Sequence, residues 1–132
     1  MITTKGRYAL RVMLDLAQHE GVIPLKDIAQ RQDVSKKYLE ILMRELVGGG
    51  LVQGISGRGG GYRLVRRPEQ YTLGEILEKM EGPLAPVACL AGGTVCCPRA
   101  SECLTLPVWT EYDRMTHDFF YGKTLMDLIR ET

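Results

Sequence analysis

Residues 35–64, SKKYLEILMRELVGGGLVQGISGRGGGYRL, decide the fold predicted for this 132-residue chain. Ser35 is a favourable N-cap, and leucines then recur at helical spacing until three consecutive glycines end the helix. Two short strand-like runs follow, LVQGI and YRLV, joined by a turn rich in glycine. A helix followed directly by a β-hairpin predicts a winged helix.

The residues before this stretch predict two more helices. Thr3 or Thr4 can cap the first, in which apolar residues recur every four positions. Pro24 stands where the first turn of a helix tolerates proline, so LKDIAQR is expected to form a short second helix. Residues 32–34 form the tight turn before Ser35. Two helices joined in this way, the second starting with basic and polar residues, predict a helix-turn-helix.

The distribution of charge favours a nucleic-acid partner. Residues 1–67 hold 12 Lys and Arg against 6 Asp and Glu, or +6, whereas residues 68–132 hold 5 against 10, or −5. Arg58 at the tip of the turn suits the narrow minor groove of double-stranded DNA. Glu40 can accept from cytosine N4 or serve to reject some sites. The predicted DNA contacts are Lys5, Arg7, Ser35, Lys36, Lys37, Tyr38, Glu40, Arg44, Ser56, Arg58, Gly59, Gly60 and Gly61.

The second half of the chain predicts two further helices. Residues 72–75, TLGE, match a capping box that opens a short helix. Pro107 begins a long helix with an apolar stripe made by Val108, Tyr112, Met115 and Phe119. This stripe is wider than a small winged helix readily covers, so it predicts a homodimer that places two recognition helices on a palindromic operator. Packing against the first helix of the same chain is an alternative, and both contacts can exist together.

The predicted fold is therefore mainly α. Residues 1–67 form a winged helix-turn-helix domain with a small β-hairpin wing. Residues 68–132 hold a loop, about 84–106, that contains all four cysteines and is the candidate cluster-binding loop discussed below. A long dimerisation helix, about 107–121, follows it. No apolar run is long enough to span a membrane and no signal peptide is apparent, so we expect a cytoplasmic protein.

All four cysteines lie within residues 89–103, CLAGGTVCCPRASEC. In a reducing cytosol, clustered cysteines more often bind metal or sense redox state than form structural disulfides. Structural zinc usually takes paired C-x2–4-C knuckles, which this loop lacks. Thiolates on a loop containing glycine can instead wrap an iron–sulfur cluster. The alternative is a set of buried or reactive thiols without metal.

Five segments together carry a specific resemblance: TTKGRYALRVMLDLA, SKKYLEILMREL, GRGGGYRL, YTLGEILEKMEG and CPRASECLTLPVW. Nearly the whole chain resembles the winged-helix family of iron–sulfur transcriptional regulators that includes IscR, NsrR and RirA, with the cluster-free relative CymR. The resemblance implies a dimer with a ligand loop before the long helix. It also implies that Cys89, Cys97 and Cys103 bind a cluster, with [2Fe-2S] preferred over [4Fe-4S].

Two positions depart from the pattern of that family. Where IscR has a histidine as fourth ligand, three residues after the last cysteine, this chain has Leu106, which cannot bind iron. Cys96 is an extra thiol beside Cys97, and adjacent residues rarely direct both side chains at one iron. The fourth ligand stays open between Cys96, a carboxylate or hydroxyl from the partner's N-terminal helix, and an exogenous ligand.

These features predict a transcriptional repressor or related regulator that controls iron–sulfur biogenesis or a related stress response, switched by the occupancy or redox state of its cluster. Two alternatives remain: a metal-free thiol-redox switch using Cys96 and Cys97, and a cluster carrier or scaffold without specific DNA binding. We do not expect an enzyme or a small-molecule substrate, because no catalytic triad, phosphate loop or carboxylate pair stands out.

Overall fold

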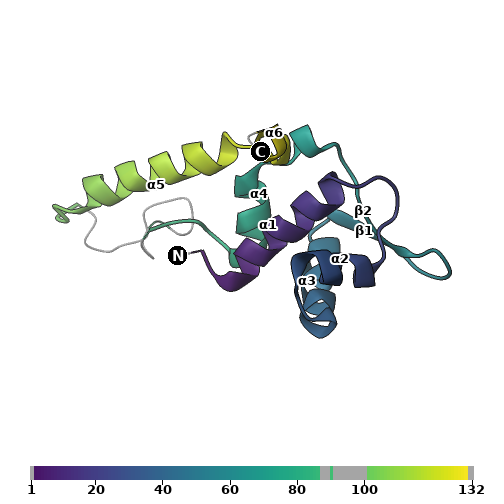
Figure 1. The fold of residues 1–132 in the computed structure, drawn as a ribbon. Coiled ribbons are helices and arrows are strands. Elements are labelled where there is room, and N and C mark those ends of the chain that lie inside the picture. Colours follow the sequence, from purple (N-terminus) through teal and green to yellow (C-terminus); the bar gives the residue numbers. More distant parts are fainter. Residues whose placement is uncertain (1, 87–89, 91–100, 131–132) are drawn as a thin grey trace.

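The computed structural model describes residues 2–86, 90 and 101–130, and its elements follow the predicted order. Figure 1 shows a helical body from which the hairpin and the long helix α5 project on opposite sides. The elements are α1 (Thr4–Ala17), α2 (Leu25–Gln32), α3 (Lys36–Gly48), β1 (Val52–Ile55), β2 (Gly61–Leu64), the 3-10 helix η1 (Pro68–Gln70), α4 (Leu73–Glu81), α5 (Leu106–Tyr121) and α6 (Leu125–Arg130). The mainly helical fold with a two-stranded wing is confirmed.

One hydrophobic core joins the two halves of the chain. The leucines of α3 that recur at helical spacing are fully buried, and they pack with the apolar face of α1. Tyr71, Ile76 of α4 and Leu125 of α6 belong to the same cluster. The core therefore includes residues from both sides of the predicted functional boundary at residue 67.

The wing is anchored to the body at its base. Strands β1 and β2 pair antiparallel with Val52 opposite Leu64 and Ile55 opposite Gly61. Tyr62 exchanges two backbone hydrogen bonds with Ile23, at 2.8 and 2.9 Å. Gly61 permits this approach, because its φ is +154° and a Cβ there would lie 2.2 Å from the carbonyl oxygen of Ile23.

Two local predictions need correction. Thr3 is the N-cap of α1, but its side chain makes no cap; its hydroxyl and N–H instead bond to the carboxylate of Glu81. The capping box of α4 is only half formed. Thr72 accepts from the N–H of Glu75 at 3.1 Å, while the Glu75 carboxylate turns away to Arg66. In both places a distant partner outcompetes the local one.

Helix α5 is fastened to α4 near its C-terminal end. The ring of Tyr121 lies against Gly74, where a Cβ would approach it to 2.3 Å. The Tyr121 hydroxyl donates to Glu78 at 2.7 Å, and burial together with this carboxylate raises the pKa of Tyr121 to about 12. Within residues 2–86, 90 and 101–130, no helix is long and apolar enough to cross a membrane.

Candidate nucleic-acid interface

Helices α2 and α3 meet in the tight turn that the sequence predicts. Asp33 ends α2 in the left-handed region at φ 53°, a conformation that aspartate tolerates better than most residues. The hydroxyl of Ser35 then accepts from the N–H of Tyr38 at 3.2 Å, so the predicted N-cap of α3 is confirmed. The result is a helix-turn-helix whose second helix begins with two lysines.

The outer face of α3 is open to solvent and mostly polar, with Ile41 and Val47 as exposed apolar residues. Lys36, Lys37, Glu40 and Arg44 are all exposed, and the leucines on the opposite face fill the core. The helix therefore presents three cations and two carboxylates, Glu40 and Glu45, over its first three turns. This is the composition that a helix needs to contact both phosphates and base edges.

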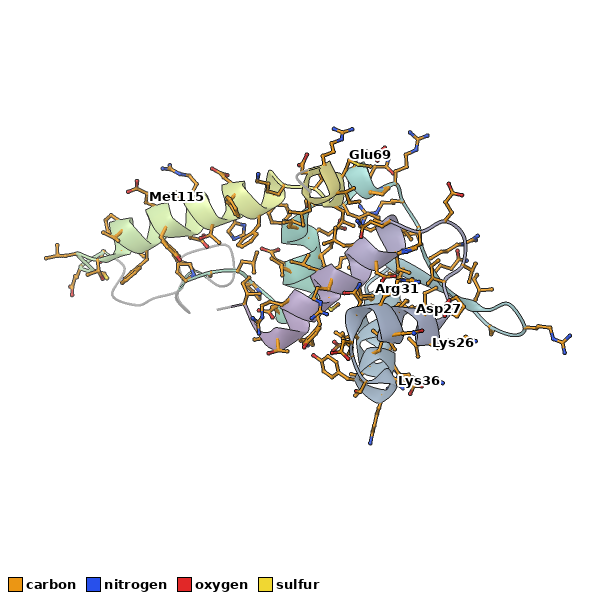
Figure 2. The ribbon with its side chains drawn as sticks, viewed as in Figure 1. Lys26, Asp27, Arg31, Lys36, Glu69 and Met115 are labelled. Atoms are coloured by element: carbon orange, nitrogen blue, oxygen red, sulfur yellow. The ribbon has the colours of Figure 1, made fainter. Side chains whose placement is uncertain are left out.

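A groove separates the start of α3 from the wing. It has a volume of about 460 Å³, and it is lined by Lys26, Lys36 and backbone of the wing, including Gly60 and Gly61. Figure 2 shows Lys26 and Lys36 on the same end of the molecule, opposite the end where Met115 lies on α5. Lys26 was not among the predicted DNA contacts. Its position in the first turn of α2, the helix before the recognition helix, could have indicated a phosphate contact.

The wing tip and the remaining predicted contacts occupy varied environments. Arg58 and Ser56 are exposed in the turn, where Gly59 has a φ of +76°. Lys5 forms an ion pair with Glu45 at 3.3 Å, and Arg7 is exposed beside it on α1. Tyr38 is half-buried, with its ring edge-on to Tyr8, so part of its surface serves the packing of α3 on α1.

A buried ion pair holds α2 against α1. The carboxylate of Asp15, 2% exposed, accepts from Arg31 at 2.7 and 3.0 Å and from Gln32 at 2.9 Å. Burial alone would raise the pKa of the Asp15 carboxyl, but these hydrogen bonds and the charge of Arg31 lower it below its usual value. The pair fixes the helix that carries Lys26.

This pair predicts a loss of stability in acid. Because the folded state depresses the pKa of Asp15, its contribution is present at neutral pH and is lost as pH falls through the ordinary pKa of an aspartic acid and below it. Asp15→Asn should cost on the order of 2 kcal/mol at pH 7, less than a fully buried pair, because the Arg31 side chain is 35% exposed. Urea unfolding at pH 7, 5, 4 and 3 measures both effects.

The matched control is Glu20→Gln. This substitution also neutralises one carboxylate, but Glu20 is exposed and lies just after the end of α1. Wild type and the control should lose stability in parallel as pH falls, whereas Asp15→Asn should show a flatter profile. Parallel profiles for all three proteins would mean that Asp15 does not carry the acid sensitivity.

Of the four cysteines, Cys103 is the one among the residues that the structure describes. Cys89, Cys96 and Cys97 lie outside the described residues, while Cys103 is half-buried with its Sγ 3.3 Å from the hydroxyl of Thr105. Leu106, three residues after Cys103, is the first residue of α5. Within the part of the chain that the structure describes, no three His, Cys, Asp or Glu side chains gather closely enough to hold a metal ion.

The predicted dimerisation residues share one exposed face of α5. Val108, Tyr112, Met115 and Phe119 are 56–60% exposed, which is unusual for large apolar side chains. The same face borders a groove of about 950 Å³ against residues 83–86. Among the residues that the structure describes, none covers the apolar face of α5.

Comparison with known proteins agrees with this architecture. The chain is 39% identical to the protein rrf2 of Nitratidesulfovibrio vulgaris strain Hildenborough over 132 residues, covering 98% of this chain and 87% of that protein. Among solved structures, it is similar to CymR, the global cysteine regulator of B. subtilis, with 36% identity, a TM-score of 0.81, and 100% and 98% of the two chains covered. It is also similar to T. potens IscR, with 34% identity, a TM-score of 0.79, and 99% and 87% covered.

Residues 2–131 match the model of the Rrf2 family, described as iron-dependent transcriptional regulators. The relatives named as HTH-type transcriptional regulators are regulators rather than enzymes, and the solved structures of CymR and IscR share the fold described above. This agreement of sequence, fold and exposed basic face identifies the chain as a member of the Rrf2 family of winged-helix transcriptional regulators.

Proposed function

We propose that this protein is a homodimeric regulator that binds a palindromic operator and responds through a cluster held by its cysteine loop. The observation that carries the proposal is the shared groove of α3 and the wing, lined by Lys26 and Lys36. In each protomer α3 enters a major groove, and Lys36, Lys37, Glu40 and Arg44 face its base edges and phosphates. Arg58 on the wing reaches the adjacent minor groove.

Arg58 should make a measurable contribution to operator binding. Arg58→Ala is expected to weaken operator binding by about 1–3 kcal/mol at constant salt. The substitution removes both the positive charge and the side chain that would enter the minor groove. Fluorescence anisotropy with an operator selected from random DNA by the wild-type protein measures the change. The exposed Arg63→Ala on β2 is the matched control, since it removes the same charge from the base of the wing. Equal affinities for wild type and Arg58→Ala would contradict the assignment of the wing.

Dimerisation follows from the uncovered face of α5. A second copy of α5 would cover the apolar side chains and set the distance between the two recognition helices. Closed two-fold symmetry is the commonest arrangement of soluble homo-oligomers, and it matches a palindromic operator. The functional division at residue 67 is part of the same proposal: residues 1–67 read DNA, and residues 68–132 hold the loop and the dimer helix.

The donor chemistry of the loop fits an iron–sulfur cluster. Cys89, Cys97 and Cys103 would hold it, because cysteine thiolates are the ligands that such clusters take in proteins. Leu106 cannot serve, so the fourth ligand comes from Cys96, from the partner's N-terminal helix or from an exogenous molecule. A cluster bound there, with [2Fe-2S] preferred, would give the loop a signal through its occupancy or its redox state.

The ends of the loop are attached to both functional parts of the chain. Cys103 lies three residues before the start of α5. At the other end, Glu81 closes α4 and accepts hydrogen bonds from the backbone N–H groups of Thr3 and Gly6 at the start of α1. Rearrangement of the loop would therefore bias both the dimer helix and the helix that supports α2 and α3.

A metal-free thiol switch is the second candidate function. It is favoured by the 36% identity with CymR, a cysteine regulator, and by the adjacent thiols of Cys96 and Cys97. A cluster carrier without specific DNA binding gains no support from a family of transcriptional regulators.

Two measurements test the proposal and separate these candidates. Anaerobic purification followed by visible absorption and by iron and sulfide analysis should reveal a coloured protein; a colourless protein without iron or sulfide indicates the thiol switch. Operator affinity should then differ between the cluster-bound and cluster-free forms. Equal affinities for several selected operators would refute regulation by the cluster.

A further inference from the structure

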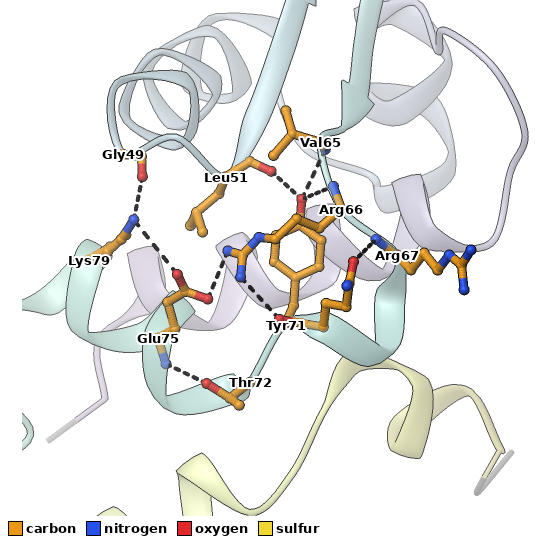
Figure 3. Close-up of polar contacts among 10 residues, drawn as sticks. Gly49, Leu51, Val65, Arg66, Arg67, Tyr71, Thr72, Glu75 and Lys79 are labelled. Atoms are coloured by element: carbon orange, nitrogen blue, oxygen red, sulfur yellow. Dashed lines mark hydrogen bonds and ion pairs between the residues drawn. The ribbon is translucent and has the colours of Figure 1, made fainter.

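The hydroxyl of Tyr71 joins the ends of the two DNA-reading elements. It donates at 2.7 Å to the carbonyl oxygen of Leu51, which lies between the end of α3 at Gly48 and the first residue of β1, Val52. It also accepts from the N–H groups of Val65 and Arg66, just after β2, at 3.0 and 3.1 Å. Tyr71 and Leu51 are both fully buried, so no water competes for the bond between them. Figure 3 shows the three bonds converging on one oxygen.

Arg66 connects the ring of Tyr71 to Glu75 of α4. The guanidinium of Arg66 lies over the ring at 4.3 Å from its centroid. The same guanidinium donates to the Gln70 carbonyl at 3.0 Å and to Glu75 at 2.8 Å. This arrangement limits the movement of Tyr71 relative to α4, and α4 is the helix that holds α5.

Lys79 of α4 makes a second attachment to the end of α3. Its ammonium group donates to the carbonyl oxygen of Gly49, the C-cap of α3, and lies 3.8 Å from Glu75. A cation at this position satisfies a carbonyl at the helix end and is favoured by the helix dipole. Its aliphatic stem lies 3.4 Å from where a Cβ of Gly49 would be, so Gly49 leaves room for the contact.

We propose that Tyr71 and Lys79 are positioning residues that set the orientation of the recognition helix relative to the wing. The inference rests on the proposed function, since it assumes that α3 and the wing bind DNA together. Neither residue faces the DNA-binding groove, so each acts through Leu51, Val65 or Gly49. Loss of the Tyr71 hydroxyl would free the base of the wing, where β1 follows α3 and β2 ends, so the wing could tilt relative to α3 and Arg58 would no longer reach its groove in register with α3.

A double-mutant cycle between Tyr71→Phe and Arg58→Ala tests this inference. The probe is an operator selected from random double-stranded DNA by the wild-type protein. Arg58→Ala should lower operator affinity about tenfold in the wild-type background but only about twofold in Tyr71→Phe. Affinity for random-sequence DNA should change by less than about twofold in Tyr71→Phe, because the set of lysines and arginines is unchanged.

Lys79 supplies a variant that avoids the buried core. Its side chain is 40% exposed, so Lys79→Met is expected to fold even if Tyr71→Phe does not. Lys79→Met should also reduce the cost of Arg58→Ala, and Lys79→Arg should restore the wild-type cost because arginine keeps the donor and the charge. Circular dichroism and thermal unfolding establish that each variant is folded.

The outcomes are distinguishable. If Arg58→Ala costs the same in the wild type, in Tyr71→Phe and in Lys79→Met, the inference is wrong while the wing assignment stands. If Arg58→Ala costs nothing in the wild type, the wing assignment fails first and the inference fails with it.

Discussion

Met115→Asp is expected to leave the protein monomeric and to lower its operator affinity by at least about 100-fold. Met115 lies in the middle of the apolar face of α5 and is 60% exposed within one chain. A carboxylate there costs little in the folded monomer, but in a dimer it would lie unpaired between two apolar faces. A monomer can bind only one half-site, so it loses the gain that two linked recognition helices provide.

Sedimentation velocity and operator titration measure the two effects on the same samples. Arg114→Asp is the matched control, because Arg114 is exposed on the same helix but outside the apolar face. The control should remain dimeric with an operator affinity close to wild type. A dimeric Met115→Asp protein at micromolar concentration would show that α5 is not the dimer helix.

The local elements of this fold could be predicted from the sequence because their signals are local. Ser35 as N-cap, the glycines after α3 and the turn around Arg58 each specify a backbone conformation within a few residues. The leucine spacing of α3 also predicts which face is buried, since packing follows the helical period. The recognition helix and the wing could therefore be predicted almost fully from residues 35–64.

The contacts that connect these elements could not be predicted in the same way. Thr3 and Glu75 carry the residue types of local caps, yet Thr3 bonds to Glu81, 78 residues away, and Glu75 pairs with Arg66. Tyr71 bonds to Leu51 across 20 residues. No periodicity marks such pairs, because they depend on how α1, α3 and α4 pack. The cysteine loop is a third case. The sequence alone identifies its four thiols as candidate ligands, and three of them lie outside the described residues.

Replacing Cys97 by serine is expected to abolish cluster binding, whereas Cys96→Ser should retain it. Serine removes the thiolate that iron requires while keeping nearly the same size, so the loss reports on ligation rather than on packing. The adjacent position provides the matched control within the same loop, since two neighbouring residues rarely both reach one iron. Cys103→Ser should behave like Cys97→Ser, because Cys103 is another of the three proposed cluster ligands.

Iron and sulfide content, visible absorption and operator affinity after anaerobic purification separate three outcomes. Loss of iron in Cys97→Ser and Cys103→Ser, with wild-type iron in Cys96→Ser, supports the assigned ligands. Loss in Cys96→Ser with retention in Cys97→Ser would exchange the two roles. Absence of iron from the wild type as well, together with peroxide-sensitive operator binding that either Cys96→Ser or Cys97→Ser removes, would replace the cluster by a thiol switch. The last outcome would still leave the dimer helix and the winged helix in their proposed roles, because neither depends on which chemistry moves the loop.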